Sequence, residues 1–267
     1  GTINGDIVGS TSLISKTGSG ALTVNGVITG GGAGLTVTGG TLVLNHTNTY
    51  GGNTILTHAT LVAGADQAFS TSRLIVQADG AVLSANKDVS FNNAVDLWYD
   101  HGLTVDTAGH SIAMSGVIRN QGGGTPGGLA KSGAGILTLS GANTYTGGTT
   151  IAGGTLRVEN NSALGSGAVT TTGSVLDYAD GITLNNPIVI DSNTTQLQVL
   201  AGIATQAGAI SELNGPRPLE KIGAGALTLS SVNTYTGGTM VSQGILSANV
   251  TGALGTGPVT INPTVAA

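Results

Sequence analysis

The chain has 267 residues, of which 46 are glycine, 8% are charged and 3% are aromatic. An ordinary domain is about 25% charged, so the 8% found here excludes an ordinary charged surface. A disordered chain is hydrophilic, so the 39% apolar content excludes disorder. The net charge of -5 leaves no basic patch, which excludes nucleic acid as a partner.

Cysteine is absent from the sequence, which excludes disulfides and thiolate metal sites. Two explanations stay open: a lineage or compartment that uses little cysteine, and a chain that crosses a membrane unfolded. No apolar run approaches the roughly 20 residues of a transmembrane helix. The first residues lack a basic region followed by an apolar stretch, so we expect any export signal to lie outside this sequence.

The first repeated unit begins at Lys16 with KTGSGALTV and resumes at Asn48 with NTYGGN. Relative to a later copy the halves are offset by 115 and 95 residues, and 115 minus 95 leaves an insertion of 20. Within it, the triplet that starts at Leu22 recurs 20 positions later at Leu42. The sequence therefore predicts a structural unit of about 20 residues.

Short apolar or β-branched triplets with a period of two, bounded by glycine or asparagine, recur along the whole chain. No segment has a sustained helical pattern, and a sandwich or barrel would need longer strands. The pattern predicts an all-β fold, a right-handed parallel β-helix of roughly 12 coils. We expect Leu, Val, Ile and Ala inside, and Thr and Ser outside.

The segment DLWYDHGLTVDTAGH, from residue 96 to 110, holds the single tryptophan and two of the four histidines. Its candidate contact residues are Asp96, Trp98, Tyr99, Asp100 and His101. Three interpretations stay open: a solvated loop that breaks the repeat, a surface that contacts a sugar or receptor, and a catalytic or metal site. Residues 120–128, NQGGGTPGG, are expected to form a protruding loop.

Two further copies begin at Lys131 and Lys221, and 23 of 40 aligned residues are identical. Paired glycines are expected to supply positive φ at sharp turns, asparagines to bond to turn backbone, and tyrosines to cover a coil or pack beside a corner. The predicted structural motif residues of the three copies are Asn48, Tyr50, Lys131, Leu137, Leu139, Asn143, Thr144, Tyr145, Gly147, Gly148, Lys221, Leu227, Leu229, Asn233, Thr234, Tyr235, Gly237 and Gly238.

Two groups of charged residues have ordinary explanations. Ordinary turn acids explain the group that contains Asp177, Tyr178, Asp180 and Asp191, since no calcium-binding glycine-aspartate array is present. An exposed, salt-bridged turn explains the group of Glu212, Arg217, Glu220 and Lys221. We therefore predict no catalytic, cofactor or metal site.

The phrase K-x-G-x-G-x-L-T-L, followed by N-T-Y-x-G-G-T, resembles the passenger-associated transport repeat of bacterial autotransporters. Copies at 131–158 and 221–248 are nearly complete, whereas in the first copy GGN replaces TGG. The resemblance implies a right-handed parallel β-helix, secreted or at the surface of a Gram-negative bacterium. It also implies a signal peptide and a partner, the outer-membrane β-barrel of the same parent chain, with no catalytic residues to carry over.

These observations predict one β-helix over residues 1–267 with three cassettes, at 16–63 (interrupted), 131–170 and 221–260. We expect a non-enzymatic extracellular stalk or adhesin that binds a host or bacterial glycan or protein, or another copy of itself. The alternative is a carbohydrate-active β-helix enzyme, a lyase or hydrolase. Such an enzyme should place at least three acidic or basic side chains on one face of adjacent coils.

Overall fold

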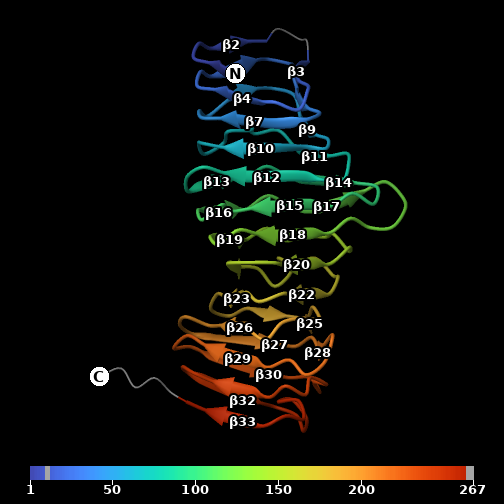
Figure 1. The fold of residues 1–267 in the computed structure, drawn as a ribbon, viewed down its shortest axis with the longest axis vertical. Coiled ribbons are helices and arrows are strands. Elements are labelled where there is room, and N and C mark those ends of the chain that lie inside the picture. The colour runs from blue at the N-terminus through green and yellow to red at the C-terminus, as the bar shows by residue number, and fades with distance from the viewer. Residues whose placement is uncertain (10–12, 263–267) are drawn as a thin grey trace.

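The computed structural model describes residues 1–9 and 13–262. Its regular structure consists of short β-strands, and among the described residues these strands pair only in parallel. The strands wind into a tall stack of about 12 turns (Figure 1). The predicted parallel β-helix is therefore confirmed. Among the described residues, no helix is long and apolar enough to cross a lipid bilayer.

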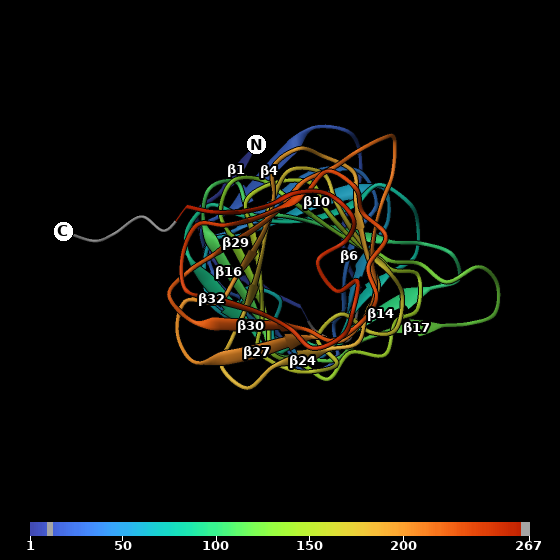
Figure 2. The same ribbon diagram turned by 90° about the horizontal axis from the view of Figure 1, so that it is seen from below.

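A complete coil has three strand positions, which we number in chain order, and the end view shows the coils superposed around a common axis (Figure 2). The first position is an 11-stranded sheet of β1 (Thr2–Ile3), β4 (Ala21–Val24), β7 (Gly40–Leu44), β10 (Ala59–Ala63), β12 (Ala81–Ala85), β15 (Leu103–Asp106), β18 (Leu129–Ser132), β20 (Thr149–Ile151), β22 (Val169–Thr171), β25 (Ile188–Ile190) and β28 (Ile210–Glu212).

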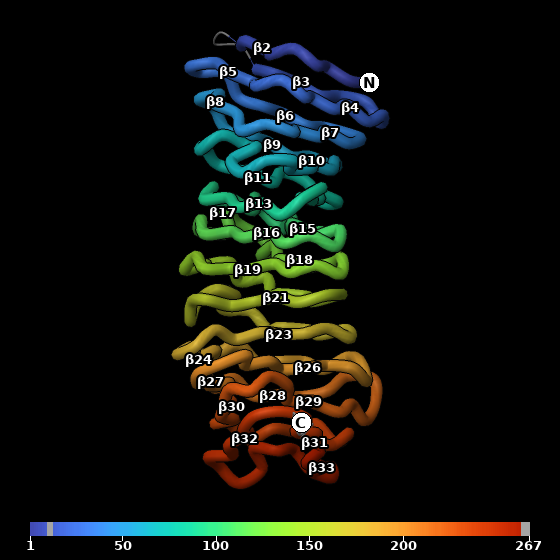
Figure 3. Tube along the Cα trace, turned by 90° about the vertical axis from the view of Figure 1, so that its left-hand side faces the viewer, coloured from blue at the N-terminus to red at the C-terminus, as the bar shows by residue number. Residues whose placement is uncertain are grey.

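Two sheets in succession occupy the second position (Figure 3). The shorter contains β2 (Ile7–Val8), β5 (Ile28–Gly30) and β8 (Thr49–Tyr50). The longer contains β13 (Val89–Phe91), β16 (Ser111–Met114), β19 (Ile136–Leu139), β21 (Thr155–Val158), β23 (Val175–Tyr178), β26 (Thr195–Gln198), β29 (Leu219–Ile222), β31 (Thr239–Val241) and β33 (Val259–Ile261).

The third position is likewise divided between two sheets. The first contains β3 (Ile14–Lys16), β6 (Leu35–Val37), β9 (Thr54–Leu56), β11 (Leu74–Val76), β14 (Val95–Trp98) and β17 (Ile118–Gln121). The second contains β24 (Thr183–Leu184), β27 (Ile203–Gln206), β30 (Ala226–Leu229) and β32 (Ile245–Ala248).

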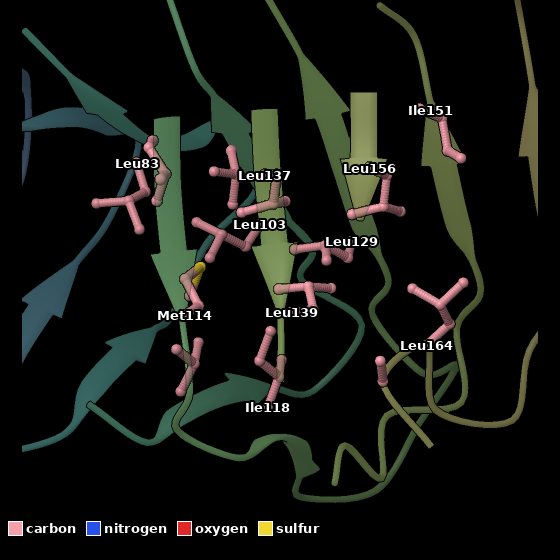
Figure 4. Close-up of a cluster of buried hydrophobic side chains, with 14 of the residues drawn as sticks. Leu83, Leu103, Met114, Ile118, Leu129, Leu137, Leu139, Ile151, Leu156 and Leu164 are labelled. Carbon is pink, nitrogen blue, oxygen red and sulfur yellow. The ribbon is translucent and has the colours of Figure 1, made fainter. Parts of the chain in front are cut away.

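Inward side chains stack in columns along the axis. In the first sheet, Leu22 pairs with Leu42, Leu42 with Leu61, and Leu61 with Leu83. Figure 4 shows such a cluster, in which Leu103 and Leu129 face Leu137 and Leu156 across the interior. Since paired strands lie about 4.8 Å apart, each aliphatic side chain packs on the one in the next coil and excludes water. The core is thus a mostly apolar column that runs the length of the stack.

The 20-residue insertion in the first copy forms one additional coil. Ala21 pairs with Thr41 and Val24 with Leu44, so the register advances by 20 residues over strands β5, β6 and β7. The chain therefore resumes its repeat without a change of strand position, because the inserted length completes a whole coil.

Removal of residues 25–44 should preserve the solenoid, because Val24 would then precede Asn45 as Leu44 does now. We expect one cooperative thermal transition within about 5 °C of the parent, since only one of the coils is lost. Circular dichroism during heating measures this. The matched control is removal of residues 25–34, which shifts every following strand to a wrong position and should lower the midpoint much further; equal midpoints for the two deletions would contradict the coil assignment.

Candidate functional site

The lysine that opens each cassette lies inside the solenoid. Lys131 pairs with Val105 above and Ile151 below, so both of its neighbours in the column are aliphatic. Its Nζ donates to the carbonyl oxygens of Ser132, Gly133 and Gly153 at 2.7 to 2.9 Å. The ammonium group therefore sits in a cage of backbone oxygens and ties its own turn to the turn of the next coil.

Lys16 and Lys221 form the same cage. Lys221 Nζ donates to the carbonyls of Ile222, Gly223 and Gln243 at 2.8 to 3.2 Å, and Lys16 donates to an equivalent set. The sequence-based interpretation of Lys221 as part of an exposed salt-bridged turn is wrong, because its side chain is buried. Burial away from water lowers the pKa of both Lys131 and Lys221 to about 8.

The cassette asparagine connects three successive coils. The Oδ1 atom of Asn143 accepts the N–H of Ile118 at 2.7 Å, and its Nδ2 atom donates to the carbonyl of Ala163 at 2.6 Å. Asn48 joins Ile28 to Ala68, and Asn233 joins Ile210 to Ala253, in the same way. A buried amide thus satisfies one backbone donor and one backbone acceptor that the turn leaves without ladder partners.

Tyr50, Tyr145 and Tyr235 are fully buried inside the corner. The hydroxyl of each is 2.5 to 2.6 Å from the Oγ1 atom of a threonine four residues later, Thr54, Thr149 or Thr239. This pairing lets a large ring fill the interior while its polar end stays hydrogen-bonded. Removal from water raises the pKa of all three phenols.

The two glycines of the cassette have different physical roles. Gly148 has a φ of 83° and Gly238 a φ of 93°, a conformation that favours glycine. Gly147 and Gly237 instead lie against the preceding coil, where an added Cβ atom would come within 2.2 Å of the backbone of Pro126 or Arg217. The first glycine permits close stacking, and the second permits the turn.

The remaining motif residues complete the corner. Leu137, Leu139, Leu227 and Leu229 are buried in the core, and the backbone N–H groups of Thr144 and Thr234 bond to the preceding coil at Ile118 and Ile210.

The cassettes begin at different strand positions: Lys16 lies in the third, Lys131 in the first and Lys221 in the second.

The candidate contact residues lie at the end of β14. Tyr99 is 53% exposed and has a φ of 55°, in the left-handed region. Its ring meets Trp98 edge-on at a centroid distance of 5.9 Å. The Nδ1 atom of His101 lies 3.2 Å from Asp79 Oδ1 and 3.7 Å from Asp100 Oδ1. The turn therefore presents an aromatic ring beside a histidine and two exposed carboxylates.

Asp96 does not belong to this surface. It lies within β14, is buried, and its carboxylate accepts from Arg119 Nε at 2.7 Å and from Arg73 at 3.1 Å. Asp96 and Trp98 are strand residues, and β15 begins at Leu103, so within this segment the solvated-loop interpretation holds only for the two turns at 99–102 and 107–110. Three charged residues on adjacent coils match the criterion set for an enzyme, but the single carboxylate is neutralised by both arginines.

The second acidic group is dispersed. Asp177 pairs with Arg157, and burial, partly offset by that arginine, raises the pKa of Asp177. Tyr178 points into the core, whereas Asp180 accepts the N–H of Ile203 from the next coil. Asp191 accepts from Asn214. In the described part of the chain, no three histidine or acidic side chains converge as a metal site would require.

Two hollows lie on the outer side of the first sheet, and the first of them adjoins the contact turn at Gly102. One of about 310 Å³ is lined by residues that include Asp79, Gly102 and Thr104, and the other of about 410 Å³ by residues that include Thr125 and Thr170. Gly147, Gly148 and Thr150 line both. A smaller hollow of about 210 Å³ lies at the corresponding corner of the third cassette, beside Met240.

The fold and its repeated corner cassettes define a solenoid repeat protein, and comparison with known proteins identifies the repeat. The model of the passenger-associated-transport-repeat family matches residues 129–158 and 219–248. The chain is also similar to the adhesin BmaC autotransporter of Brucella suis biovar 1 (strain 1330), with 34% identity over 130 residues. That match covers 48% of this chain and 4% of the relative. No solved structure matches the chain.

Two stretches of the chain therefore match the passenger-associated transport repeat, and the predicted resemblance to an autotransporter passenger is confirmed. The matched residues contain Lys131, Asn143 and Tyr145, with their equivalents in the later copy. Sequence reasoning did not find the lysine cage, because a lysine beside a glycine turn has the pattern of an exposed residue. Its recurrence two residues before a glycine in all three copies was the available signal.

Replacing Asn143 with alanine should lower the free energy of unfolding by about 2 to 4 kcal/mol, because a buried N–H and a buried carbonyl both lose their partner. Equilibrium unfolding in urea measures the change. Asn92→Ala, at an exposed asparagine of another turn, is the matched control and should change stability by less than about 0.5 kcal/mol. Equal effects of the two substitutions would contradict the proposal that the Asn143 side chain joins adjacent coils.

The free energy of unfolding should rise between pH 8 and about pH 10. The unfolded chain keeps both lysines protonated up to their usual pKa of 10.5, whereas the folded chain releases these protons near pH 8. The unfolded state then binds more protons, so stability increases with pH, by roughly 2 kcal/mol for each lysine. Above pH 10 the buried tyrosines reverse the trend, because only the unfolded chain loses their protons.

Urea unfolding at a series of pH values tests this expectation. The double variant Lys131→Met and Lys221→Met should be less stable overall and should lose the rise between pH 8 and 10. A rise that persists unchanged in the double variant would show that other groups cause it.

Proposed function

We propose that this chain is part of the extracellular region of an autotransporter, where it forms a rigid stalk with an adhesive surface. The recurrence of one three-coil corner cassette, matched by the transport-repeat family, carries the proposal. The similarity to a protein named as an adhesin autotransporter supports the adhesive role. The parent chain would then supply the outer-membrane β-barrel as its partner, and the chain would act at the cell surface of a Gram-negative bacterium.

A physical argument connects the cassette to export. The stability of a solenoid is approximately a sum of coil terms and nearest-neighbour terms, so coils that emerge one after another can fold onto those already outside. The cassette strengthens this coupling because Asn143 bonds to the coil before and to the coil after its own. Folding outside the cell would then bias movement outward without a nucleotide-driven motor.

Gly147→Val in the full-length parent should slow its appearance on the cell surface, because the added side chain collides with the backbone of the preceding coil. Surface labelling at successive times after induction should show a delay of several-fold. Gly123→Val, in a loop where an added Cβ meets nothing within 4 Å, is the matched control and should be exported normally. Normal export of both variants would remove the proposed link between coil stacking and transport.

A further inference from the structure

The two adjoining hollows form one trough along the solenoid axis, over the outer side of strands β15, β18, β20 and β22 and of the turn that precedes β12. Asp79 lies at one end and Thr170 at the other. At the Asp79 end the trough meets the turn of residues 98–102, which we name the aromatic turn. The hydrogen bond between Asp79 and His101 joins the two, and Gly102 belongs to both.

The trough offers hydroxyl groups rather than free backbone groups. Leu103 donates to the carbonyl of Gly128, and Leu129 to that of Gly148, so these floor groups are already engaged in the ladder. A peptide strand therefore has no open edge to join. The side chains along the trough include Thr104, Thr125, Thr146, Thr150 and Thr170. A row of hydroxyls with one carboxylate suits a partner that itself carries many hydroxyls.

The charge around the trough selects among such partners. Asp79 and Asp100 are both exposed, and no lysine or arginine lines either hollow within the described residues. Sulfated, sialylated or uronate-rich glycans would meet repulsion without a compensating cation. The exposed Tyr99 ring, held against Trp98, supplies a flat apolar surface of the kind on which the C–H face of a sugar ring packs.

We propose that the trough and the aromatic turn bind a linear, neutral, β-linked glycan that lies along the solenoid axis. This inference rests on the proposed adhesive function and assigns its ligand class. Tyr99 contacts one sugar ring, Asp79 and Asp100 accept from its hydroxyls, and the threonine row contacts the following rings. Coils stack at about 4.8 Å, close to the advance per ring of an extended glycan, so each coil meets one ring. Five successive coils contribute lining residues, which sets the bound length at about five rings.

The test is isothermal titration of the chain with β-1,4-linked glucose and N-acetylglucosamine oligosaccharides of two to six rings, and with oligogalacturonate of equal length. Affinity for a neutral series should increase with length and level off near five rings, and oligogalacturonate should bind at least tenfold more weakly. Tyr99→Ala should weaken binding about tenfold, the effect of losing roughly 1.4 kcal/mol. Tyr99 is exposed, and its left-handed backbone conformation is no less favourable for alanine than for tyrosine. The variant should therefore fold normally.

Two pairs of variants locate the site. Asp79→Asn should weaken binding several-fold, whereas Asp88→Asn, an acid of equal exposure (77%) that also lies near a histidine, should not. Thr150→Val should weaken it about threefold, whereas Thr60→Val, on the same sheet outside the trough, should not.

Failure to bind any neutral oligosaccharide, stronger binding of oligogalacturonate, or equal effects within each pair of variants would overturn the inference. Such a result would leave the adhesive function standing if bacteria that display the parent chain still attach to host cells and attachment is unchanged by Tyr99→Ala. Loss of attachment for the whole parent protein, with glycan binding intact, would instead count against the proposed function alone.

Discussion

The polar groups that the repeated cassette places in the interior of this protein are hydrogen-bonded within one coil of their own. Each coil closes its backbone hydrogen bonds with its two neighbours, and its aliphatic side chains fill the space between them. The cassette introduces an ammonium, an amide and a phenol into that interior. Every one of them bonds to backbone or to a nearby threonine: Lys131 to three carbonyls, Asn143 to two coils, Tyr145 to Thr149. The repeated sequence therefore forms a corner in which each buried polar side chain has its hydrogen-bond partners within the protein.

Much of this architecture was predictable from sequence because spacing reflects geometry. The 20-residue step from Leu22 to Leu42 identified the coil length, and the resumed phrase identified the extra coil. The lysine cage was not predictable in the same way, since the oxygens around Lys221 belong to backbone and carry no residue identity. The location of Asp96 was missed because Arg73 and Arg119 are each 23 residues away and approach it only after the coils stack.

The proposed stalk and the proposed adhesive surface make different demands on the same coils. In the first sheet the register advances by 26 residues between Val105 and Lys131, against 20 between Lys131 and Ile151. The additional residues form the loop after β17, which protrudes from the stack (Figure 1) beside the aromatic turn. The ladder of the first sheet continues past this loop through β18 and β20. Length variation is thus confined to a corner, where a recognition surface can change without disturbing the column of aliphatic side chains.

The three cassettes start at the third, the first and the second strand position in turn. The interval from one cassette to the next is therefore a whole number of coils plus part of a coil. The asparagine corners of the three cassettes therefore point in three different directions around the long axis, so the side-chain bonds that join coils are not concentrated on one side of the solenoid.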